Sequence, residues 1–123
     1  MTGILELIRK LVGAGDSASP FDTDLLMHIN SVFFILSQIG VGPTDGFVAT
    51  EDSEWTEFLQ GSTAKLELVK SYVYLKVRLL FDPPSSATVL SSMEKQIAEY
   101  ESRLMVAADP NLIVESEGTS DEE

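Results

Sequence analysis

The 123-residue chain contains no cysteine and a single histidine, His28. Without cysteine it has no disulfide framework, no thiolate ligand for a metal and no thiol nucleophile. His28 has no second ligand at metal-binding spacing and no evident catalytic partner, so we expect a solvated or capping side chain. Gly13 and Gly15 lack the preceding strand and the following Lys-Ser/Thr of a phosphate-binding loop. The sequence therefore predicts a protein that is not an enzyme and holds no metal or cofactor.

Basic residues are also scarce, with 8 Lys and Arg against 20 Asp and Glu, for a net charge of −12. Six acids and no base occupy the last fifteen positions: Asp109, Glu115, Glu117, Asp121, Glu122 and Glu123. Acidity on this scale argues against binding nucleic acid by neutralising phosphates. It would instead repel DNA that came close.

Long apolar runs are absent, and none approaches the roughly 20 residues needed to span a bilayer. The apolar N-terminal stretch MTGILELIRKLVG carries Glu6, Arg9 and Lys10 at its centre. A secretory signal has an uninterrupted apolar core there. We therefore expect a soluble, cytoplasmic product that does not associate with membranes.

Apolar residues do recur at helical spacing over most of the chain, which favours an all-α fold. Two segments show the spacing most clearly: Leu25, Ile29, Val32, Leu36 and Ile39, then Leu90, Met93, Ile97, Tyr100, Leu104 and Ala107. The whole pattern predicts a small bundle of three main helices, at about 23–39, 63–81 and 85–108, with a short helix at 54–60 and a helical arm at 3–12. Residues 46–50 are apolar enough for one short strand, too isolated to define a sheet.

The stretch YVYLKVRLLFDPPSS decides between helix and strand for residues 63–81. The segment is about 18 residues long, far beyond the usual strand of roughly 5–6. A strand would also have to accommodate Lys76 and Arg78 within its apolar run. We therefore expect a helix that is buried on most of its circumference and ends by Phe81, because a residue before proline avoids the α region. The double proline at 83–84 then predicts a tight hairpin into the next helix.

Polar residues and glycines mark where the predicted helices begin and end. Asp22 or Thr23 is expected to cap the second helix, and Gly40 to end it. Ser53, together with Glu57 in the first turn, fits a cap for the short helix. Ser85 and Ser86 precede the last helix.

These boundaries divide the chain into an N-terminal arm and linker (1–20), a helical domain (21–108) and a flexible acidic tail (109–123). The arm at 3–12 is too short to be stable alone in water, and the apolar triad Leu112, Ile113 and Val114 cannot hold itself in place either. We expect both to order on a partner. A purely solubilising tail is the alternative.

The apolar residues of the 63–81 helix occupy all but one of its sides. The remaining side, a stripe along the helix, carries Lys70, Tyr74, Arg78 and Phe81. It fits either an ordinary solvent face or a contact with another subunit, because Tyr, Phe and Arg are enriched at such contacts. Basic residues concentrate in this helix, so in an acidic protein the stripe could meet the acidic face of an identical subunit.

Three parts of the sequence together resemble a known family. FDTDLLMHINSVFFILSQIGVGP, a Trp-x-x-Phe-Leu element and VKSYVYLKVRLLFDPPSSATVLSSMEKQIAEYESRL are similar to the head–tail connector (adaptor, or head-completion) proteins of tailed bacteriophages. The resemblance covers about residues 21–105. It implies a structural virion protein, an all-α subunit without catalytic residues, in which positions such as Gly40, Trp55, Tyr72 and Pro83 set the fold.

In such a family the subunits form a ring, typically dodecameric, which binds beneath the portal and extends the DNA channel toward the tail. The implied partners are further copies of the chain, the portal, and a tail-side connector or tail terminator protein. DNA would pass without specific binding. The implied location is the head–tail interface of the virion, reached from the host cytoplasm during assembly. A small helical regulatory or adaptor protein that binds another protein through its terminal arms is the alternative function.

Overall fold

The computed structural model describes residues 3–15, 17–43, 45–59 and 63–108. It contains five helices: α1 (Ile4–Leu11), α2 (Asp22–Gln38), α3 (Trp55–Phe58), α4 (Thr63–Phe81) and α5 (Ala87–Ala108). Within these ranges the only β-type pairing is an isolated antiparallel bridge between Gly3 and Glu54. The all-α prediction is confirmed, and the helix bounds differ from the predicted ones by at most two residues. None of the described helices has the length and apolar character needed to cross a membrane.

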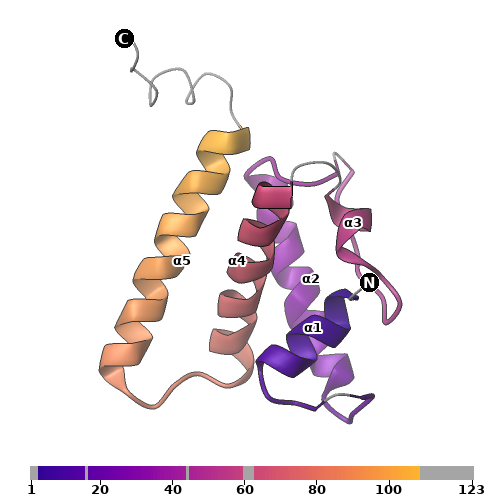
Figure 1. Ribbon diagram of the computed structural model, residues 1–123, viewed down its shortest axis with the longest axis vertical. Coiled ribbons are helices and arrows are strands. Elements are labelled where there is room, and N and C mark those ends of the chain that lie inside the picture. The colour runs from indigo at the N-terminus through magenta and orange to yellow at the C-terminus, as the bar shows by residue number, and fades with distance from the viewer. Residues whose placement is uncertain (1–2, 16, 44, 60–62, 109–123) are drawn as a thin grey trace.

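Helices α2, α4 and α5 lie side by side and antiparallel, with α4 in the middle (Figure 1). The chain descends through α4, turns at residues 82–86 and returns through α5, so the expected hairpin is present. Helix α1 packs across α2 and α4. This order makes α4 the central helix, which explains why its apolar residues are not confined to one narrow stripe.

The core forms where α1, α2 and α4 meet. The α2 residues Leu25, Ile29, Val32 and Leu36 are fully buried, as their spacing predicts. Helix α4 contributes Val69, Tyr72, Val73 and Val77. Phe33 of α2 is surrounded by the rings of Phe47, Trp55 and Phe58, with centroids 4.4 to 6.2 Å away. The loop between α2 and α4 therefore closes the core with aromatic side chains.

Helix α5 is less buried than its apolar stripe predicts. Ile97 and Leu104 are buried, but Leu90, Met93 and Tyr100 are only half-buried and Ala107 is exposed. The reason is its position at the edge of the layer, where its main contact is with α4. Periodicity shows that a helix has an apolar face, but not how many neighbours cover that face.

Helix α1 orders on its own bundle, which corrects the expectation that the arm needs an external partner. Ile4, Leu5 and Ile8 are at most 1% exposed. The backbone N–H of Ile4 donates to the carbonyl of Ser53 at 3.0 Å. The apolar stripe of the arm is therefore already covered within one chain.

The ends of the helices test the predicted caps. Gly40 has φ +93°, and the N–H of Val41 donates to the carbonyl of Leu36, which closes the C-terminus of α2 as expected. Ser86 Oγ accepts from the N–H of Val89 at the start of α5.

Two predicted caps are wrong. Phe21, not Asp22 or Thr23, is the residue before α2, because the Asp22 carboxylate binds Arg9 instead. Ser53 closes the preceding turn by accepting from the N–H of Thr50 at 2.8 Å. At α3 the N–H of Glu54 donates to Glu57 at 3.3 Å.

Candidate interaction surfaces

The four predicted subunit-contact residues of α4 lie in order along the helix and are all half-buried. Lys70 Nζ is paired with Glu67 at 3.0 Å. Arg78 donates from Nε to the carbonyl of Asp82 at 2.9 Å and from Nη1 to the hydroxyl of Tyr74 at 3.4 Å. These bonds hold the basic groups at the surface of the helix.

Part of this stripe also packs within the chain. Phe81 meets Phe21 edge to face, with ring centroids 5.5 Å apart, and Tyr74 packs against the core. The stripe is thus a fixed surface with apolar support beneath its charges. The partner-docking residues Leu112, Ile113 and Val114 lie outside the described residues.

A second charged surface lies in the loop that includes α3. Five acids fall within 45–57 without a Lys or Arg among them: Asp45, Glu51, Asp52, Glu54 and Glu57. All are exposed except the half-buried Glu54. The molecule therefore has an acidic loop region and a basic central helix, a separation that the composition alone does not reveal.

The described surface was compared with the sites that metal ions and catalytic histidines require. No group of three or more His, Asp or Glu side chains that could hold a metal occurs in the ranges that the structure covers. His28 is half-buried beside Ser31, at the rim of a groove between α2 and α4. It lies outside the buried α2 stripe of Leu25, Ile29, Val32 and Leu36.

Tyr72 and Glu101 form a hydrogen bond between α4 and α5. The Tyr72 hydroxyl donates to Glu101 Oε2 at 2.6 Å, and the Tyr72 side chain is fully buried. Burial, together with the hydrogen bond to the nearby carboxylate, raises the pKa of Tyr72 well above its usual range. This hydrogen bond fixes the position of α5 against α4.

Arg9 and Asp22 form a bidentate ion pair that sequence analysis missed. Arg9 Nε and Nη2 lie 3.1 and 3.0 Å from the two Asp22 oxygens, and Ser19 also donates to that carboxylate through its N–H. The Arg9 hydrogen bond lowers the pKa of Asp22, and the same contact raises the pKa of Arg9. An aspartate at the start of a helix is usually interpreted as a capping residue. Only the fold shows that Asp22 binds Arg9 instead.

Asn30 holds the loop after α2 against that helix. Its amide accepts from the N–H of Ala49 at 2.6 Å and donates to the Ala49 carbonyl at 3.2 Å. Residues 46–50 do not form the short strand that was considered, because a side chain rather than a second strand satisfies this backbone.

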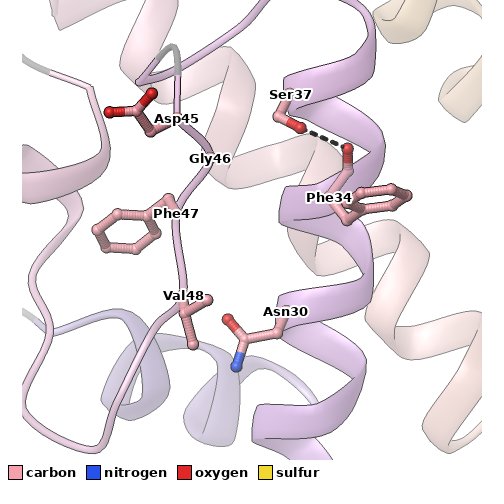
Figure 2. Close-up of a pocket in the computed structure, with 7 residues that line it drawn as sticks. All are labelled: Asn30, Phe34, Ser37, Asp45, Gly46, Phe47 and Val48. Carbon is pink, nitrogen blue, oxygen red and sulfur yellow. Dashed lines mark hydrogen bonds between the residues drawn. The ribbon is translucent and has the colours of Figure 1, made fainter.

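Residues 45–48 of the loop and one face of α2 border an open hollow of about 400 Å³ next to Asn30 (Figure 2). Phe34 and Val48, which line it, are 62% and 74% exposed. Asp45 is its only charged lining residue among those described.

The described residues form a helical bundle with a basic helix face, an acidic loop region and an open surface hollow. These features suit a structural, protein-binding subunit. A family model described as phage connector protein matches residues 4–111, which is most of the chain and spans all five helices. The chain therefore belongs to the phage connector protein family and is a structural phage protein that links head and tail. No curated protein and no solved structure shows significant similarity. The family resemblance noted in the sequence is thus confirmed, and it extends to α1.

Proposed function

We propose that the chain forms a ring, dodecameric as in its family's pattern, that binds beneath the portal and continues the DNA channel toward the tail. The observation that carries this proposal is the family match over residues 4–111. The ring would contact the portal on one side and a tail-side connector or tail terminator on the other. Its place is the head–tail interface of the virion, after assembly in the host cytoplasm.

The charge distribution supports a contact between identical subunits. Lys70, Tyr74, Arg78 and Phe81 form a basic and aromatic surface, whereas the loop within 45–57 is acidic. In a ring every subunit presents one surface to one neighbour and a different surface to the other. Opposite charges on the two surfaces would orient the subunits and suppress wrong pairings.

The acidity of the chain supports its role around DNA. With a net charge of −12, a ring of such subunits repels phosphates, so DNA passes without adhering. A channel lined in this way needs no sequence-specific contact.

The tail supplies the proposed docking element, with Leu112, Ile113 and Val114 as its contact residues, and attachment of the chain to the portal depends on it. Deleting residues 109–123 should abolish attachment to the portal while the helical circular dichroism spectrum stays unchanged. Normal attachment of the shortened chain would contradict this role.

Charge reversal tests the subunit contact. Arg78→Glu should prevent ring formation, because it places a carboxylate opposite an acidic neighbour. Arg103→Glu is the matched control, since Arg103 is an exposed α5 residue whose ion pair among the described residues is with Glu99, one turn away. Normal rings from the Arg78 variant would show that this surface is not the contact.

A further inference from the structure

A second apolar hollow, of about 410 Å³, lies between α2 and α4 and is not used by the contacts proposed above. Val32 and Ile35 of α2 and Leu79 and Leu80 of α4 form its apolar lining. Leu80 is 53% exposed although it belongs to the central helix. The last turns of α4 therefore present a leucine surface, formed by the largely uncovered Leu80 and the half-buried Leu79.

The charge of this hollow is the opposite of the charge of the protein. Lys76 lines it, and no carboxylate does among the described residues. Lys76 Nζ lies 6.0 Å from the centre of the Tyr72 ring, and it makes no ion pair within the described part of the chain. The hollow thus fits a segment that is apolar and is followed closely by carboxylates.

The tail of this chain has that chemistry. Leu112, Ile113 and Val114 are followed at once by Glu115 and, two positions later, by Glu117. Three branched apolar side chains would cover the leucine surface, and the carboxylates would fall near the Lys76 ammonium.

The hollow of the same chain is too far away for this segment. Its α4 lining residues, Lys76, Leu79 and Leu80, belong to the last two turns of that helix. These turns precede the 82–86 connection, whereas α5 ends at the opposite end of the bundle (Figure 1). A helix of 22 residues such as α5 rises about 33 Å. The four residues from Asp109 to Leu112 span at most about 14 Å. The segment can therefore meet this hollow only in another copy of the chain.

We infer that Leu112, Ile113 and Val114 of one subunit bind in the α2–α4 hollow of a second subunit, with Glu115 and Glu117 beside its Lys76. This inference rests on the proposed ring and names the partner of the tail within it: the neighbouring copy rather than the portal. The contact joins two different surfaces, so it propagates in one direction and closes when the ring is complete. Loss of the tail would then weaken portal attachment because the ring itself is not held together.

Disulfide trapping tests the contact cleanly, since the natural chain has no cysteine. The full-length double variant Leu80→Cys with Ile113→Cys, oxidised with copper phenanthroline on portal-bound assemblies, should give a ladder of linked subunits on a denaturing gel. The matched control is Phe34→Cys with Ile113→Cys, because Phe34 is also an exposed apolar residue of α2 but lines the other hollow. The control should give no ladder.

Lys76→Glu in the Leu80/Ile113 background should reduce the ladder several-fold, and adding Glu115→Lys and Glu117→Lys should restore it. Equal ladders from the Phe34 control, or a disulfide within one chain, would overturn the inference. A ring seen by mass without a Leu80–Ile113 link would overturn it too, while the proposed function would stand. The absence of any assembly of several copies on the portal would contradict both.

Discussion

Arg9 and Asp22 join α1 to the start of α2 through two hydrogen bonds of 3.1 and 3.0 Å between guanidinium and carboxylate. Their side chains are only 10% and 14% exposed. The arm is thus held by an ion pair in addition to its buried apolar stripe. Stability should depend on both charges.

Asp22→Asn should lower the free energy of unfolding at pH 7 by about 1.5–3 kcal/mol, the usual range for a hydrogen bond to a charged group. Because the fold lowers the pKa of Asp22, its contribution is present above the ordinary carboxyl pKa of about 4. It is lost as the pH falls through the lower pKa of the folded state. The difference between the two proteins in urea unfolding should therefore shrink below about pH 4. Asp24→Asn, at an exposed position in the same turn, should have little effect at either pH.

Tyr72→Phe should cost about 1.5–3 kcal/mol at pH 8, because it removes the 2.6 Å bond to Glu101. Since the fold raises the pKa of Tyr72, the hydroxyl contributes fully below its ordinary pKa of about 10 and progressively less above it. Urea unfolding at pH 8 and above pH 10 should show a smaller difference at the higher pH. The half-buried Tyr100, changed to Phe, provides the control. A pH-independent difference would show that packing, not the hydroxyl, matters at position 72.

Gly42→Ala should destabilise the protein more than Gly13→Ala, although both glycines have positive φ, +96° and +83°. A Cβ at Gly42 would lie 2.4 Å from the Phe58 ring, whereas one at Gly13 would meet nothing within 4 Å. The Gly13 variant should lose about 1–2 kcal/mol, the cost of the left-handed conformation. The difference between the stability losses of the two variants, measured by thermal unfolding, gives the cost of the contact with Phe58. Equal losses would mean that this ring moves aside without cost.

Asn30→Ala should loosen the loop after α2, because Ala49 loses both of its amide contacts. We expect a loss of about 1–3 kcal/mol and faster proteolytic cleavage within 41–59. Ser31→Ala is the neighbouring control, since its hydroxyl donates to the Met27 carbonyl within the same helix and not to the loop residues that the structure describes. Unchanged cleavage in the Asn30 variant would show that the aromatic contacts alone hold the loop.

Much of this fold could be predicted because its signals are local. The bounds of α4 follow from apolar spacing and from Pro83, and the end of α2 follows from Gly40. The contacts of Arg9 with Asp22 and of Asn30 with Ala49 could not be predicted, because each joins residues 13 or 19 positions apart across a loop.

The candidate surfaces also divide into features that the local sequence predicts and features that depend on how the helices pack. Lys70, Tyr74 and Arg78 share a helix face that spacing predicts, and the structure places them there. The α2–α4 hollow depends on how closely the two helices approach each other. The amino-acid sequence of either helix alone does not reveal that distance. Its basic edge at Lys76 is recognisable only once the groove is known.

The most direct test of the account is the mass of the complex that the purified chain forms with its portal, measured by native mass spectrometry. The account predicts a ring of identical subunits in fixed stoichiometry on the portal, with the copy number read from the mass. A complex of one chain with one partner protein, and no ring on the portal, would contradict it and favour a small helical regulator instead.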